Sequence, residues 1–220
     1  MNLFDIYFSP VNYFTKLKEK PKWLVPLIIL VVCAIIITIV VLARFNPQDR
    51  ISQLREQNLT PEQIERAEKM MHGPFPIISG ILASIIFTPL ILLLIAVIFN
   101  FLLPLLGASG PFLMTFSVFV GAALVRIPGM IIKIILILIK GTPFVQTSFV
   151  LFFPMISKNT FLFRLMSKLD FFTIWEMILA AFGLQIVYSF KGKKIYYLVL
   201  GLWLVFVLIT SIFGFRGGPR

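Results

Sequence analysis

The sequence has few of the side chains on which catalysis and metal binding depend. It contains one cysteine, Cys33, one histidine, His72, and only 9 Asp and Glu residues in 220. A single cysteine forms no disulfide within the chain and no cysteine-rich metal site. One cysteine and one histidine, far apart, argue against a zinc site or a nucleophilic triad. The isolated glycines form neither a phosphate loop nor a dinucleotide fingerprint. We therefore predict a protein that is not an enzyme and that holds no metal or other cofactor.

Charged residues are also scarce, at 13% of the chain, whereas 59% of the residues are hydrophobic and the mean hydropathy is +1.00. The charges that are present are unbalanced, because 20 Lys and Arg residues face 9 acidic ones and give a net charge of +11. In a soluble protein this excess would suggest nucleic acid. Here the basic residues lie mostly at the ends of apolar runs, where they meet anionic headgroups and set topology. We expect binding to membrane lipids and none to nucleic acid.

Five long apolar runs determine the fold class. Each reaches or approaches the roughly 20 residues that an α-helix needs to cross a bilayer core of about 30 Å. A helix on a soluble protein would instead alternate an apolar stripe with a charged one. We predict an all-α polytopic membrane protein, formed by a single domain over residues 1–220 with five transmembrane helices. The runs cover residues 23–43, 75–105, 112–139, 171–190 and 195–213.

Residues 1–22 predict an amphipathic helix at the membrane interface, with a plain linker as the alternative. Ser9-Pro10 is typical of a helix start. Apolar residues then recur on one side of the helix and lysines on the other, and Trp23 marks the interface where the first span begins. The apolar residues are Val11, Phe14 and Leu17, and the lysines are Lys16, Lys18 and Lys20.

Residues 44–74 hold five of the nine acidic residues and predict a small helical hairpin outside the bilayer. Asn46-Pro47 opens the first helix. Thr60-Pro61-Glu62-Gln63 opens the second helix as a capping box, in which two side chains satisfy backbone N–H groups at the helix start. A docking element for a partner and a solvated cap over the bundle both remain open as its role.

Two further features interrupt the apolar runs. Pro128 and Gly129 lie in the middle of the third run and predict a kink or break, because proline removes a helix hydrogen bond. Residues 140–170 are aromatic and basic but too short to span reliably. We expect an interfacial segment there, with a shallow re-entrant stretch at 142–155 and a short helix after it.

Three ionisable residues lie within the predicted spans, namely Arg126, Lys133 and Glu176. Charges at this depth cost a few kcal/mol and usually face the bundle interior. Counted from the connection at 140–170, Lys133 and Glu176 both lie roughly 9–10 Å deep, and Arg126 and Gln185 both lie roughly 21–22 Å deep. We predict a Lys133–Glu176 pair, with Arg126 reaching Gln185 or carbonyls freed by Pro128. Contacts that fix helix register, a transport pathway and a lipid or ligand pocket remain open as the role of these residues.

Three stretches of the chain carry a family resemblance. Residues 9–29 are a proline, aromatic and basic lead into the first span, and residues 106–128 are a small-residue turn before a span with a central proline. Residues 168–200 are an acidic, aromatic and tryptophan entry to the fourth span followed by a basic hairpin, whereas residues 44–74 show no shared motif. In these stretches the chain resembles the Yip-domain family of integral membrane proteins, which are named for binding Ypt/Rab GTPases, and it looks like a prokaryotic-type member. The resemblance implies five helices, a cytoplasmic N-terminus, the opposite side for the C-terminus, and no established catalysis. Some bacterial relatives are associated with export and envelope-stress systems.

Together these observations favour a non-enzymatic membrane scaffold or accessory protein. Such a protein would bind other membrane proteins, with an export system among the implied partners, and would organise or shape the membrane. The alternative is a small transporter or lipid translocator that uses the polar bundle interior. A homo-oligomer remains open, and the expected location is the cytoplasmic membrane if the source is prokaryotic.

Overall fold

The computed structural model describes residues 2–45, 60–71, 73–143, 145–153, 155–157 and 160–213. Over these ranges the regular secondary structure is helical throughout, which confirms the all-α prediction. Two short 3₁₀ turns accompany the α-helices. The elements are α1 (Asp5–Phe8), α2 (Pro10–Glu19), α3 (Leu24–Ala43), α5 (Pro61–Met71), α6 (Phe75–Leu102), η1 (Leu103–Leu106), α7 (Phe112–Ala123), α8 (Arg126–Lys140), η2 (Phe149–Phe152), α9 (Phe161–Lys168), α10 (Phe171–Val187) and α11 (Lys194–Phe213).

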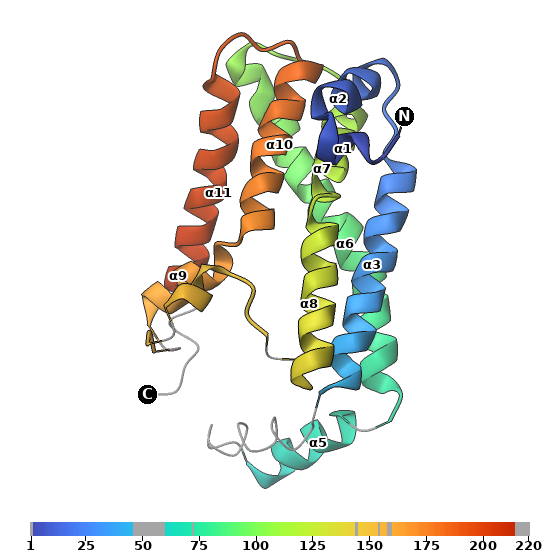
Figure 1. Ribbon diagram of the computed structural model, residues 1–220, viewed down its shortest axis with the longest axis vertical. Helices are drawn as coiled ribbons and strands as arrows, with labels where there is room; N and C mark the ends of the chain where they lie inside the picture. Colours follow the sequence, from blue (N-terminus) through green and yellow to red (C-terminus); the bar gives the residue numbers. More distant parts are fainter. Residues whose placement is uncertain are drawn as a thin grey trace.

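The long helices form an up-and-down bundle (Figure 1). The helix α3 leads away from α1 and α2, α6 returns, α7 and α8 descend together, α10 returns and α11 descends again. Four helices in the described ranges are long and apolar enough to cross a membrane, and α9 with α10 makes a fifth if the pair, bent by 58°, is one span. The chain is therefore a polytopic helical membrane protein.

The break in the third apolar run lies one turn earlier than predicted. The helix α7 ends at Ala123 and α8 begins at Arg126, so Leu124 and Val125 form the break and Pro128 lies in the first turn of α8. A proline ring clashes with the carbonyl four residues before it, which here is that of Leu124, whereas proline is tolerated in the first turn of a helix. The helix therefore breaks before Pro128 and not at it.

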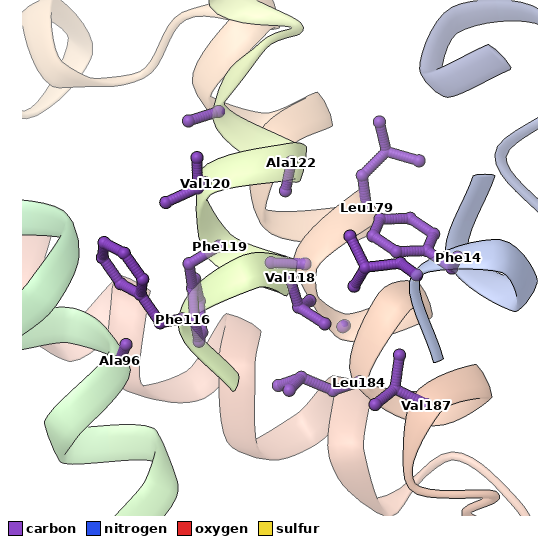
Figure 2. Packing of buried hydrophobic residues seen from close by; sticks show 14 of the residues in the cluster. Phe14, Ala96, Phe116, Val118, Phe119, Val120, Ala122, Leu179, Leu184 and Val187 are labelled. Carbon is purple, nitrogen blue, oxygen red and sulfur yellow. The ribbon is translucent and has the colours of Figure 1, made fainter. Parts of the chain in front are cut away.

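The core is concentrated around α7, where every residue from Thr115 to Ala123 is buried. Side chains from α2, α6 and α10 pack around it. Figure 2 shows Phe14, Ala96 and Leu184 from these three helices together with Val118 of α7. Elsewhere large apolar side chains of α3, α6 and α11 face outward. Such a surface would be unfavourable in water but suits lipid tails, which are as apolar as leucine.

Two predictions about the segments outside the bundle are tested by the described residues. The second helix of the polar hairpin is α5, and its capping box is present. The Thr60 N–H donates to Gln63 Oε1 at 3.0 Å, and the Gln63 N–H donates to Thr60 Oγ1 at 3.3 Å. The short helix expected late in residues 140–170 is α9. The first hairpin helix, expected from Asn46-Pro47, lies outside the described residues.

Candidate functional site

An ion pair joins two spans near the middle of the bundle. Arg126 is the first residue of α8, and its Nε lies 2.8 Å from Glu176 Oε2 on α10. The Glu176 side chain is only 4% exposed, whereas that of Arg126 is 37% exposed. Arg126 Nε has no aligned hydrogen-bond partner, so the contact is a charge pair and not a directed hydrogen bond. The pair neutralises a carboxylate that would be costly to bury alone.

The predicted Lys133–Glu176 pair is wrong, because Glu176 contacts Arg126 instead. The prediction assumed that the end of α8 and the start of α10 lie at the same depth, on either side of the connection between them. Figure 1 shows that α10 begins well above the lower end of α8. Each residue of α10 therefore faces a residue nearer the start of α8 than equal counting suggests.

Gly129 fixes this register between the two helices. A Cβ atom at Gly129 would lie 2.5 Å from the ring of Phe172, so the ring packs directly on the α8 backbone. Glu176 lies one turn beyond Phe172, and Arg126 lies nearly one turn before Gly129 in the antiparallel helix. Gly129 was expected to contribute to a kink, whereas in the structure it permits this close approach of Phe172.

Gln185 also has partners other than the predicted one. Its Nε2 donates to the Gly192 carbonyl at 3.2 Å, and its Oε1 accepts a hydrogen bond from the Tyr196 hydroxyl at 2.9 Å. These contacts tie the end of α10 to the start of α11. Gln185 thus stabilises the hairpin between the last two helices and does not reach Arg126.

The Leu124 carbonyl, which Pro128 leaves without its usual helix donor, accepts hydrogen bonds from the Tyr7 hydroxyl and from the Ile127 N–H rather than from Arg126. The Tyr7 hydroxyl donates to the Leu124 carbonyl at 2.6 Å, across the break between α7 and α8. Burial raises the pKa of Tyr7 to about 12, so the donor stays protonated at ordinary pH. Sequence reasoning missed Tyr7. The available signal was the proline, which identifies a carbonyl four residues earlier that needs another donor.

The N-terminal unit, α1 with α2, docks against α7 and α10. Ile6, Tyr13, Phe14 and Leu17 are completely buried. A Cβ atom at Gly121 of α7 would lie 2.8 Å from the Tyr13 ring, and one at Gly183 of α10 would lie 2.5 Å from the Phe14 ring. The two glycines therefore leave room for the two rings.

This docking corrects the predicted orientation of the amphipathic helix. Phe14 and Leu17 face the bundle, whereas Val11, assigned to the same face, is 57% exposed. Val11 is one of three exposed large apolar residues of the N-terminal unit, with Phe4, 67% exposed, and Phe8, 86% exposed. We call these three residues the outer apolar row. The N-terminal unit thus buries one set of apolar side chains on the bundle and leaves another set exposed.

The residues proposed for the membrane interface have mixed environments. Lys16 lies 3.4 Å from Asp5 and joins α2 to α1, whereas Lys18 Nζ donates to Ser189 Oγ at 2.7 Å and joins α2 to the segment after α10. Lys20 is exposed. The Trp23 ring packs on Phe116, with 5.6 Å between ring centroids.

A groove runs along α3, α6 and α8 on another side of the bundle. It consists of two adjoining cavities of about 400 and 620 Å³, which share Thr38, Gly80 and Ala83 in their walls. Arg126 lines the first cavity and Lys133 lines the second. Within the described ranges, no group of three or more His, Cys, Asp or Glu side chains is placed to hold a metal ion.

Comparison with known proteins gives a family match over nearly the whole chain. Residues 4–213 match the Yip1 domain, a range that begins in the N-terminal unit and ends with α11. It also includes residues 44–74, for which the resemblance offered no motif. No curated protein and no solved structure matches the chain. Because the match covers the docked N-terminal unit together with the helical bundle, the chain belongs to the Yip1 domain family.

Proposed function

We propose that this protein is a non-enzymatic membrane scaffold or accessory protein that binds other membrane proteins and shapes the surrounding membrane. The family supports an integral membrane protein of this general kind. The observation that carries the proposal is the outer apolar row on the N-terminal unit. An export or trafficking assembly is the proposed setting, with the N-terminal unit on the cytoplasmic side.

The N-terminal unit that carries the outer apolar row is anchored to the bundle. Four buried side chains and the Tyr7–Leu124 hydrogen bond hold the unit in place, while Phe4 and Phe8 stay exposed. Lys20 of the same unit is also exposed. An element that carries exposed aromatic residues and lysines is suited to the boundary between headgroups and acyl chains. An apolar row at that depth would displace lipids in one leaflet and bend the membrane, or pack on the span of a partner.

The test compares Phe4→Ala/Phe8→Ala with the control Phe75→Ala/Phe206→Ala. The control residues are also exposed, at 59% and 64%, but lie on α6 and α11. The proteins are reconstituted in vesicles at one protein-to-lipid ratio, and vesicle diameter is measured by electron microscopy. We expect wild type and control to give smaller vesicles than the Phe4/Phe8 variant.

The same variants test partner binding by affinity purification from native membranes in mild detergent. Membrane proteins that co-purify with wild type and control are expected to be lost from the Phe4/Phe8 variant. If the Phe4/Phe8 variant matches wild type in both vesicle diameter and co-purification, the outer apolar row does not carry the function.

A small transporter or lipid translocator is the second candidate. The groove that Arg126 and Lys133 line is the observation in its favour. However, Arg126 is engaged by Glu176, and Gln185 by Tyr196, so these polar side chains do not follow one continuous path. Lipid flip-flop in reconstituted vesicles separates the candidates, because only a translocator accelerates it above that of protein-free vesicles.

A further inference from the structure

The groove between α3, α6 and α8 has the size and shape of a ligand site. Its two cavities, of about 400 and 620 Å³, each lie within the range of roughly 300–1,000 Å³ that is usual for ligand pockets. Most of the lining is apolar, including Leu30, Phe87 and Met130 in the first cavity and Ile37 and Val41 in the second. An elongated, mainly apolar groove on a membrane-spanning bundle suits an acyl chain.

Small residues create this groove. A Cβ atom at Gly80 of α6 would lie 2.8 Å from Thr38 of α3, so the two helices approach closely there. The Thr38 and Ser84 hydroxyls lie 3.0 Å apart and satisfy each other. Ala83, which lines both cavities, leaves space that a larger side chain would fill.

Lys133 gives the groove a positive charge that no described residue neutralises. Its side chain is half-buried, and none of the described residues forms a hydrogen bond or ion pair with it. Among the described residues that line the two cavities, none is Asp or Glu. A cation at this depth is costly without a partner. An anionic ligand would remove that cost.

The position of Lys133 fits a lipid phosphate. Lys133 lies roughly 10 Å along α8 from Lys140, the last residue of the helix. The flexible lysine side chain extends toward the headgroups and so brings its ammonium group closer to them. The ends of α3 and α8 lie side by side (Figure 1), and each carries an exposed basic residue, Arg44 and Lys140. The Arg126 charge, deeper in the groove, is already compensated by Glu176.

We infer that this groove binds one anionic phospholipid from the leaflet at the α5 end, with its phosphate on Lys133 and an acyl chain extending along the groove toward Arg126. The positive charge at this end favours an anionic headgroup over a zwitterionic one. The inference is independent of the proposed function, which rests on the N-terminal unit at the other end of the bundle.

The test measures thermal stability of the full chain in detergent while phosphatidylglycerol or phosphatidylcholine with identical acyl chains is added. A ligand that binds only the folded protein raises the melting temperature in a concentration-dependent way. We expect phosphatidylglycerol to act at lower concentration than phosphatidylcholine. Lys133→Met is expected to weaken the phosphatidylglycerol effect roughly tenfold, whereas Lys133→Arg retains it.

Two controls complete the test. Lys140→Met removes a lysine from the same helix but outside the groove, and it is expected to weaken the phosphatidylglycerol effect much less than Lys133→Met does. Ala83→Leu fills the groove, and it is expected to weaken binding of the lipid without removing a charge. Water-soluble glycerol phosphate, which has the headgroup chemistry but no acyl chains, is expected to have no effect.

Three results would overturn the inference. The first is equal stabilisation by the two lipids in the wild type. The second is an equal loss in Lys133→Met and Lys140→Met, which would indicate nonspecific attraction to the surface. The third is full stabilisation by glycerol phosphate, which would show an anion site without an acyl-chain groove. If Lys133→Met does not fold, unchanged lipid binding by Ala83→Leu would equally refute the groove.

Discussion

Glu176 places a carboxylate in the interior of the bundle, where its contact with Arg126 decides whether it is tolerated. Removing one partner of a buried ion pair leaves the other charge uncompensated and costs more than removing both. The ion pair therefore forms only where α8 and α10 pack in this register.

Glu176→Gln is expected to lower the stability of the protein in detergent by about 3 kcal/mol, at the low end of the range for such pairs because Arg126 is 37% exposed. Arg126→Met with Glu176→Gln should recover part of the loss. Thermal unfolding of the two single variants and the double variant measures the coupling. Lys133→Met provides the control, since its effect should simply add to that of Glu176→Gln. Strong coupling between positions 133 and 176 would instead restore the pairing that the sequence suggested.

Tyr7 is a second residue that stabilises the break in the third span, because its hydroxyl donates to a carbonyl in that break. Tyr7→Phe removes the hydrogen bond to the Leu124 carbonyl and should cost about 1 kcal/mol at neutral pH. Because the folded-state pKa is raised to about 12 from 10.0, the stabilisation is present below pH 10 and is lost as pH rises through 12. The difference in melting temperature between wild type and Tyr7→Phe should thus narrow over that interval. A constant difference would show that the hydroxyl does not act through this bond.

At the scale of elements, α2 is docked by two aromatic rings that pack on glycine backbones. Tyr13 packs on Gly121 and Phe14 on Gly183, and burial raises the pKa of Tyr13 above its ordinary value. Docking of this kind tolerates no added side chain, because there is no free volume between ring and backbone. The N-terminal unit should therefore respond to changes on α7 and α10 that leave its own sequence intact.

Gly183→Ala is expected to displace Phe14 and loosen the N-terminal unit, at a cost of about 1–3 kcal/mol for overpacking. Trypsin cleavage near Lys16 and Lys18 reports the loosening, since docking protects that segment. Gly201→Ala on α11 is the matched control, because a Cβ atom there would meet no atom within 4 Å. Equal cleavage rates in the two variants would mean that Gly183 does not hold the N-terminal unit.

In the molecule as a whole, two short lysine-rich segments lie at one end of the bundle. Figure 1 shows α1, α2 and the turn between α10 and α11 at one end, and the far end of α11 at the other. Lysines of residues 16–22 and 191–194 therefore gather at the same end. Short basic segments favour the cytoplasmic side.

We expect an odd number of crossings, with residues 2 and 219 on opposite sides of the membrane. Asn2→Cys and Pro219→Cys, each placed in a Cys33→Ala background, should react with a membrane-impermeant thiol reagent from opposite sides. Labelling in sealed vesicles of known orientation makes the measurement. Reaction of both positions from one side would mean an even number of crossings, either because residues 142–156 also cross or because one of the five predicted spans does not.

Local patterns in the sequence were enough to predict that this protein lies in a membrane and where most of its helices run. Length and hydropathy of an apolar run are local properties, and in lipid a helix satisfies its backbone polar groups within one segment. Local chemistry also predicted the capping box at Thr60 and Gln63, which the structure contains. It predicted a break near Pro128, although the clash with the Leu124 carbonyl moves the break one turn earlier.

Contacts between polar side chains of different helices depend on how the helices pack, and local patterns in the sequence did not predict them. Glu176 contacts Arg126 rather than Lys133 because α10 starts well above the end of α8, and no local pattern encodes that offset. Likewise the sequence showed an apolar face on α2, but not that Gly121 and Gly183 on distant helices would receive its rings. Helix formation depends on neighbours along the chain, whereas depth and docking depend on contacts between residues that are 43 to 169 positions apart.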